Sequence, residues 1–343
     1  MKRIFVAIMA LGALVSCSKD ELVSVNRQAI QFGESFVGNA TRAIDPSHVA
    51  TDINEFQVWG TMTGASNTVN LFAGANVTRG NAANGAAFTC TQTEYWVPDA
   101  SYVFAAVANH NGVTATSGLP ETIAFTYTDG TKDLLYTKTT NNVTTNASAA
   151  PTTGVNTSGI VNFTFDHLLS KLQFKFVNGA TDAKHIFKVK DIKIAGLPAS
   201  GTYTVGAETP WEATGNTGTA MFGNASNATT ATATAVDIKQ NAPITSNYAR
   251  LVIPHTAANL TITFVKELYY DADGDGVADA SELIYSDANK TTDDKCTSLS
   301  LKNQAFAPNG NYVLVATLTS GSKIEFTVQA LSDWATSADI TLQ

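Results

Sequence analysis

The sequence has few cysteines and few charged residues. Cys17, Cys90 and Cys296 are the three cysteines among 343 residues, too few for the disulfide framework of a small secreted domain. Cys90 and Cys296 can pair or stay free, and spacing alone does not choose between the two states. Charged residues make up 15% of the chain and its formal net charge is −8. An acidic chain without a basic stripe excludes nucleic acid as a partner.

Catalytic motifs are also missing. The chain contains no serine-hydrolase elbow, no HExxH pair and no glycine-rich phosphate loop. Its five histidines show no metal-ligand spacing. His167 follows Asp166 and could form an acid–base pair, but within an apolar strand we expect a hydrogen-bonded structural histidine. Acidic residues are plentiful, yet nothing singles out a glycosidase pair. The sequence therefore predicts a protein that is not an enzyme.

Long apolar runs are absent after the N-terminus. Lys2 and Arg3 precede the run Ile4–Val15, which is shorter than the ~20 residues of a spanning helix. A charged start, a short apolar run and small residues before the cut are typical of a secretory signal. Leu-Val-Ser-Cys17 matches a bacterial lipobox, in which the cysteine thiol is acylated. We predict that residues 1–16 are a lipoprotein signal peptide and that lipid at Cys17 anchors the chain.

Residues 17–47 are predicted to form a lipid tether and one removable strand. Ile30 and Phe32 continue an alternation that starts at Val23, as expected of strand material. Small and polar residues surround Arg42 and Ala43, the composition of an exposed loop that proteases cut.

The rest of the chain alternates with a period of two. Short runs rich in β-branched and aromatic residues are bounded by Gly, Asp or Thr clusters, which favours sandwiches over βαβ units. The segment Trp96–Val103 is echoed by Phe306–Val313, since each has an aromatic residue, a Pro-Asx turn and a Tyr-Val strand. We expect an all-β chain of two sandwich domains, at 48–177 and 178–343; chance recurrence of a hairpin is the alternative reading of the echo.

Acidic residues in 271–282 follow the order of a twelve-residue calcium loop. Carboxylates stand at positions 1, 3, 5, 9 and 12, with a glycine at position 6, and the carbonyl of position 7 adds an oxygen. The predicted ligands are Asp271, Asp273, Asp275, Val277, Asp279 and Glu282. The preceding residues read as a strand, so we expect one structural Ca²⁺ on a loop or hairpin; a solvated acidic turn is the alternative.

A series of short motifs, in order along nearly the whole chain, resembles the fimbrillins of Bacteroidales, the subunits of type V pili. The matching pieces are the lipobox at Cys17, Thr41-Arg42-Ala43, Phe56-Gln-Val-Trp59-Gly60, Tyr95-Trp96 with Tyr102-Val-Phe, Asp133-Leu-Leu, Phe163-Thr-Phe-Asp-His167-Leu-Leu-Ser-Lys171-Leu, Pro308-Asn-Gly-Asn-Tyr312 and Asp333-Trp334. Ser18–Glu21 also resembles the signal that sends lipoproteins of this order to the outside of the outer membrane; a solvated charge run is the alternative.

The resemblance implies two transthyretin-like β-sandwiches in tandem, exported as a lipoprotein to the outer membrane and the fimbriae. It also implies that a trypsin-like protease cuts between Arg42 and Ala43, with Arg27 as a competing site. Loss of the N-terminal strand then opens an apolar groove that a strand from another copy or a related pilus subunit fills. We expect the donor in the C-terminal run, which also fits the domain's own last strand. Its candidate residues are Ile324, Phe326, Val328, Ile340 and Leu342.

Two alternatives remain open at this point. The acidic loop departs from the family's pattern, which favours a tip or accessory subunit over a repeating stalk subunit. A monomeric surface lipoprotein that binds glycan or a host ligand would share the anchor and the sandwiches, and exposed Trp or Tyr side chains would distinguish it. Trp211 lies in a predicted loop and is the tryptophan placed for that role.

Overall fold

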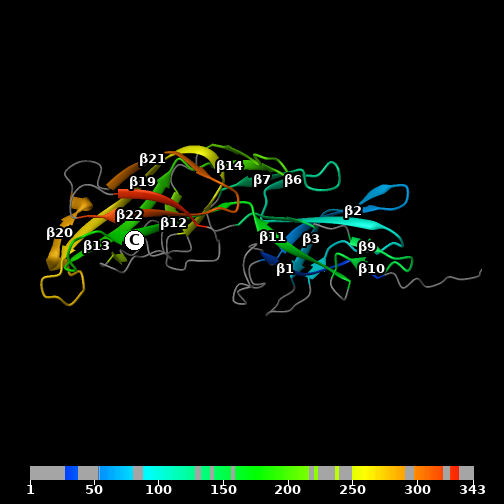
Figure 1. Cartoon of the computed structure of the whole chain (residues 1–343), viewed down its shortest axis with the longest axis horizontal. Helices are drawn as coiled ribbons and strands as arrows, with labels where there is room; N and C mark the ends of the chain where they lie inside the picture. Colours follow the sequence, from blue (N-terminus) through cyan, green and yellow to red (C-terminus); the bar gives the residue numbers. More distant parts are fainter. Residues whose placement is uncertain are drawn as a thin grey trace, which may run out of the picture.

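The computed structural model describes most of the chain as β-strands. It describes residues 28–37, 53, 55–79, 88–127, 133–139, 143–155, 159–215, 220–222, 236–238, 249–289, 297–319 and 325–331. These residues contain no α-helix, only two short 3₁₀ turns, so the predicted all-β class is confirmed. The strands form two lobes along the longest axis of the molecule, with a small sheet between them (Figure 1).

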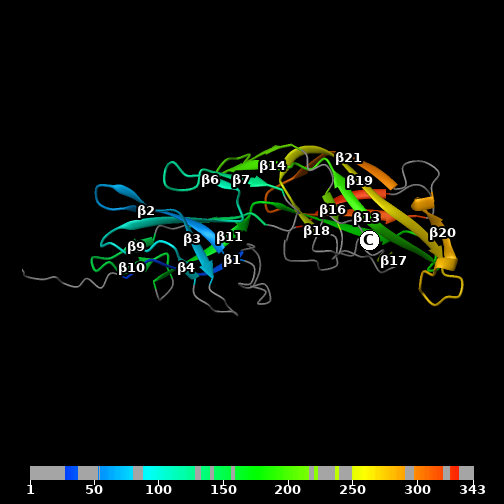
Figure 2. The same ribbon diagram turned by 180° about the vertical axis from the view of Figure 1, so that it is seen from behind.

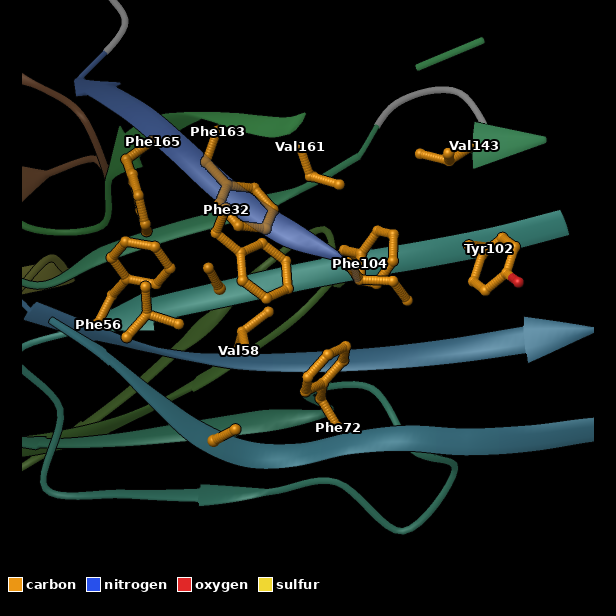
Figure 3. Packing of buried hydrophobic residues seen from close by; sticks show 14 of the residues in the cluster. Phe32, Phe56, Val58, Phe72, Tyr102, Phe104, Val143, Val161, Phe163 and Phe165 are labelled. Carbon is orange, nitrogen blue, oxygen red and sulfur yellow. The ribbon is translucent and has the colours of Figure 1, made fainter. Parts of the chain in front are cut away.

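A nine-stranded sheet builds the first lobe. Its main order is β1-β11-β8-β5-β2-β3-β4, while β9 pairs with β5 and with β10. The strands are β1 (Gln31–Val37), β2 (Glu55–Thr63), β3 (Thr68–Arg79), β4 (Phe88–Cys90), β5 (Ser101–Ala108), β8 (Leu135–Lys138), β9 (Val143–Thr145), β10 (Pro151–Thr153) and β11 (Ile160–His167). Alternate residues of β11, Val161, Phe163 and Phe165, are buried, as the period of two requires. They lie in a core rich in phenylalanine (Figure 3).

Two sheets build the second lobe. The four-stranded sheet has the order β18 (Ala249–Val252), β12 (Ser170–Asn178), β22 (Asn311–Leu318), β23 (Glu325–Leu331). The six-stranded sheet has the order β16 (Ala220–Phe222), β13 (His185–Ala195), β19 (His255–Tyr270), β20 (Leu283–Ser286); β17 (Val236–Ile238) also pairs with β13 and β21 (Thr297–Phe306) with β19. Phe176 of β12 and Phe264 of β19 meet edge to face with ring centroids 5.4 Å apart, so side chains of the two sheets share one core.

The chain passes from one lobe to the other at Leu168 and Leu169. The sequence indicates a strand that breaks near His167, and β11 does end there. However, β12 pairs in parallel with β22, from Lys171 opposite Asn311 to Asn178 opposite Leu318. The boundary predicted near residue 178 therefore falls after a strand that already belongs to the second lobe. Both strands alternate in the same way, so the local sequence carries no signal for which partner each one takes.

A third sheet joins segments that are far apart in the sequence. Its order is β15 (Trp211–Thr214), β14 (Ser200–Thr204), β7 (Thr122–Thr126), β6 (Gly112–Thr114), and β6, β7 and β14 lie between the two lobes (Figure 2). Its side chains pack in a cluster with Leu168 and Leu169. The indole N–H of Trp211 donates to the Leu168 carbonyl at 2.9 Å. Trp211 is thus partly buried at the junction and does not provide the exposed platform that its predicted loop position suggested.

The sequence echo corresponds to the same local structure in both lobes. The Tyr102 hydroxyl accepts a hydrogen bond from the Val97 amide at 2.7 Å, and the Tyr312 hydroxyl accepts one from the Ala307 amide at 2.9 Å. In both places the turn residue before the strand has a positive φ and the aromatic ring two residues before that turn contacts the tyrosine. The repeat therefore encodes a turn in which a tyrosine side chain holds the backbone.

Candidate functional sites

The segment 28–37 lies between two parts of the first lobe. On one side β1 pairs in parallel with β11, from Gln31 opposite Ile160 onward. On the other side the Ile30 amide donates to the Glu94 carbonyl at 2.8 Å, and the Trp96 amide donates to the Gln28 carbonyl at 3.1 Å. The segment therefore fills the gap between β11 and residues 94–96. We call this gap the β1 groove.

The side chains of this segment complete the first core. Ile30 and Phe32 are each 4% exposed. The Phe32 ring stacks on Phe163 with centroids 5.7 Å apart and meets Phe72 and Phe104 edge to face at 5.4 and 5.7 Å (Figure 3). Burial of a phenylalanine stabilises by ~1.5–3 kcal/mol, and each favourable ring pair adds ~0.5–1.5 kcal/mol. Removal of the segment would expose an aromatic-lined surface.

The pairing of β1 with β11 is irregular. Phe32 lies opposite Val161 and Ser35 opposite Phe163, so β1 has one more residue than β11 across this interval. Gly33 falls in the irregular part, where an added Cβ would lie 2.5 Å from Asn162 Oδ1 and from Ile160 Cγ2. Such a bulge disrupts the ladder locally. The strand is thus well buried through its side chains and less regular in its backbone.

The predicted strand of the tether is therefore present as β1, although its start near Val23 lies outside the described residues. The lipidation residue Cys17 and the cleavage residues Arg42 and Ala43 also lie outside the described residues. Lipidation and cleavage stay predictions.

The C-terminal run contributes an edge strand. β23 pairs antiparallel with β22, with Phe326 opposite Ala316 and Val328 opposite Leu314. Within the described part of the chain, the other edge of β23 pairs with no strand. In this structure β23 is thus the last strand of its own lobe, as the alternative interpretation has it, and donation to another copy stays a prediction. The other proposed donor residues, Ile324, Ile340 and Leu342, lie outside the described residues.

The acidic loop connects two antiparallel strands. It starts where β19 ends and is followed by the 3₁₀ turn Ala280–Glu282 and β20, so strands rather than long helices flank it. One carboxylate oxygen from each of Asp271, Asp273 and Asp275 lies within 4.8 Å of the others. Glu282 Oε1 accepts a hydrogen bond from the Ala272 amide at 2.6 Å. Three predicted ligands are brought together, while Val277, Asp279 and Glu282 lie outside that group.

The carboxylates of this loop differ in their protonation. Burial raises the pKa of Asp271, but the amides of Gly276 and Gly274, at 2.9 and 2.6 Å, outweigh this effect, so its pKa lies below the ordinary value. The Asp275 amide lowers the pKa of Asp273, but desolvation and the nearby Asp275 and Glu282 charges raise it more. Like charges at this spacing repel, and a divalent cation would offset the repulsion. The oxygen-only donor set fits a hard cation such as Ca²⁺.

His167 has a partner that the sequence pattern did not identify. Its Nδ1 lies 2.5 Å from Asp133 Oδ2, across the contact between β11 and the residues before β8, and not against the adjacent Asp166. Burial raises the pKa of the Asp133 carboxyl although His167 acts against that shift. The only signal for this pair was that Asp133 belongs to a motif quoted above. The pair is a buried structural contact, as expected for His167.

These features define the class of protein. It is an all-β, two-lobed protein whose N-terminal strand completes the core of the first lobe. Among the described residues, no helix has the length and apolarity needed to cross a membrane.

The sequence itself assigns the family. A model of the fimbrillin-like family matches residues 41–334, and the chain belongs to that family. It is therefore a fimbrial or cell-adhesion protein of the cell surface, from a family of structural proteins rather than enzymes. A search of curated proteins found no match.

Solved structures show the same fold. A fimbrial protein from Bacteroides vulgatus superposes with a TM-score of 0.55 at 13% identity, over 88% of this chain and 98% of that one. A protein classed with cell adhesion from Bacteroides uniformis has a TM-score of 0.48 at 16% identity, over 90% and 99%. The fimbrial anchor protein Mfa2 from Porphyromonas gingivalis has a TM-score of 0.33 at 10% identity, over 88% and 95%.

Proposed function

We propose that this chain is a structural subunit of a cell-surface pilus that is cut after Arg42 and polymerises by strand exchange through the β1 groove, serving adhesion. The observation that carries the proposal is the position of Phe32, which lies upstream of Arg42 in the sequence and inside the first core in space. A cut after Arg42 turns this core strand into a separate peptide.

Cleavage changes the energetics of the strand without changing its contacts. Before the cut the strand is tethered, so its effective concentration at the groove is high. After the cut it dissociates into bulk solution and its return becomes bimolecular. The open groove then presents unpaired backbone groups of β11 and the rings of Phe72 and Phe163, which another extended strand can cover.

The position of the cut decides whether the groove opens. A cut after Arg27 leaves residues 28–37 attached to the body of the protein, so the groove stays filled. A cut after Arg42 frees them. Of the two arginines, only Arg42 therefore serves activation by a trypsin-like protease.

Lipidation at Cys17 fits the same step. Cys17 and β1 lie on the same side of Arg42 in the sequence. The cut therefore separates the lipid anchor and the strand from the body of the subunit together. A precursor held on the outer membrane by its lipid would become free to assemble when its groove opens.

The acidic loop is proposed to hold a structural Ca²⁺. Asp271, Asp273 and Asp275 would supply its first oxygen ligands, because their carboxylates already converge. The cation would stiffen the connection between β19 and β20 at the far end of the second lobe (Figure 1).

One observation favours the alternative of a monomeric lipoprotein that binds glycan or another ligand. Five large apolar side chains around the acidic loop and β20 are more than a third exposed: Tyr270, Val277, Leu283, Ile284 and Tyr285. Exposed tyrosines can stack on sugar rings. Such a surface suits a ligand as well as a neighbouring subunit, and the polymerisation experiment separates the two functions.

The test is limited trypsin-like digestion of the chain starting at Ser18, followed by mass spectrometry and unheated gel electrophoresis. A single early cut after Arg42, with multimers that survive until boiling, is expected. Arg42→Ala should abolish the multimers and Arg27→Ala, the matched control, should leave them unchanged. Resistance at Arg42, or a cut product that stays monomeric, would overturn the polymer function and favour ligand binding.

A further inference from the structure

We infer that the β1 groove selects its donor strand by an aromatic side chain at the position of Phe32, and that the donor is the segment Ile324–Val328 of a second copy of this chain. This inference rests on the proposed function, and it specifies the partner of the same groove.

The shape of the groove requires an aromatic side chain. Phe72, Phe104 and Phe163 approach the Phe32 ring from three sides, two by their edges and one face to face (Figure 3). Edge-to-face contacts depend on the charge distribution of a ring, which an aliphatic side chain lacks. A leucine would also leave part of the volume empty, and an unfilled volume among packed rings is unfavourable.

The groove also fixes the spacing of the donor residues. Ile30 and Phe32 both point into the core, because alternate residues of a strand share one face. The donor must therefore place an aliphatic residue two positions before the aromatic one. Its backbone must also reach the partners of the present strand, the Glu94 carbonyl and β11.

One of the two predicted donor segments has this pattern. Ile324-Glu-Phe326 repeats the spacing of Ile30-Gln-Phe32, whereas Ile340-Thr-Leu342 has no aromatic residue. The same spacing occurs at Ile123–Phe125 and Ile262–Phe264, but these lie in β7 and β19, which are paired on both sides. β23 has a single partner, β22, so it can leave by breaking one ladder.

The irregular register of β1 gives the exchange a direction. Between Phe32 and Ser35 the present strand has an extra residue relative to β11. A donor without this insertion would form an uninterrupted ladder with β11 and bind more tightly than the strand that it replaces. The donor segment contains no glycine after its aromatic residue, since Thr327 and Val328 follow Phe326.

The experiment uses the full chain cut after Arg42 and fluorescently labelled peptides. Peptides of residues 28–37 and 323–331 are expected to bind, and their Phe32→Leu and Phe326→Leu versions to bind at least about tenfold more weakly. The peptide of residues 336–343 should bind more weakly than that of 323–331. A 28–37 peptide that lacks Gly33 should bind more tightly than its parent. Leucine peptides that bind as tightly as their parents, or preference for 336–343, would overturn the inference.

Failure of the proposed function gives a different result. If the 28–37 peptide itself does not exchange into the cut protein, the groove does not open and strand exchange is refuted. In the whole chain, Phe326→Leu should slow multimer formation while Val328→Leu, a change at an exposed position of the same strand, should not. Thermal unfolding of both variants shows whether the second lobe stays folded, and equal rates for two folded variants would again overturn the selectivity.

Discussion

Replacement of Phe32 by alanine is the most direct perturbation of the β1 groove. The side chain is 4% exposed and contacts three rings, so the change removes both apolar burial and ring contacts. Phe→Ala changes in protein cores cost ~3–5 kcal/mol. In this case nearly all of the cost falls on strand release, because the groove is empty in the released state with either residue.

The expected size of the effect follows from this cost. Each 1.4 kcal/mol is about a tenfold change in an equilibrium constant, so release of the strand should become ~10²–10³ times more favourable. In the uncut chain the tether opposes release. In the chain cut after Arg42, multimers should therefore form faster than in the parent protein, until another step limits the rate.

The assay is the appearance of multimers on unheated gels at fixed times after cleavage. Phe176→Ala is the matched control, because Phe176 is equally well buried but belongs to the core of the second lobe. It should lower the stability of the protein by a similar amount without accelerating assembly. If Phe32→Ala assembles at the parent rate, or Phe176→Ala accelerates assembly equally, β1 is not the strand that leaves.

Three further changes test other parts of the structure. Addition of Ca²⁺ at 100 times its Kd should stabilise the parent protein by ~2.7 kcal/mol and raise its Tm, whereas Asp271→Asn should lose the shift. Trp211→Phe should lower the free energy of unfolding by ~1–3 kcal/mol, because the Leu168 carbonyl loses its donor at the junction. Burial raises the pKa of Glu267, but hydrogen bonds from Lys190 and Tyr269 lower it further, so its pKa lies below the ordinary 4.5. Its stabilising effect is therefore present above that value and lost as the pH falls, and Glu267→Gln should flatten the acidic side of a plot of Tm against pH.

Controls for these changes come from the surface of the same protein. Glu212→Gln and Glu208→Gln replace exposed carboxylates and should alter neither the calcium shift nor the acidic limb. Tyr203→Phe changes a ring next to Trp211 without removing a donor to Leu168. A parent protein without a calcium shift, a Trp211→Phe variant no less stable than Tyr203→Phe, or an unchanged acidic limb in Glu267→Gln would contradict the respective argument.

The elements that sequence alone predicted are those encoded by neighbouring residues. The period of two determined the all-β class, because alternate side chains of a strand must face the core. The same alternation at Ile30 and Phe32 marked the N-terminal strand before its partners were known. The echo between Trp96–Val103 and Phe306–Val313 reproduced the same tyrosine-held turn, since a turn is fixed by adjacent residues.

Tertiary structure decided which strands meet. β12 alternates like β11, yet it pairs with β22, more than a hundred residues later in the sequence. His167 contacts Asp133 rather than its neighbour Asp166, and Trp211 reaches the Leu168 carbonyl from a segment predicted to be an exposed loop. An alternating pattern states which face of a strand is buried but not against what, because the partners come together only when the whole chain folds. The groove filled by Phe32 is therefore a property of the fold, although the residues that fill it could be recognised in the sequence.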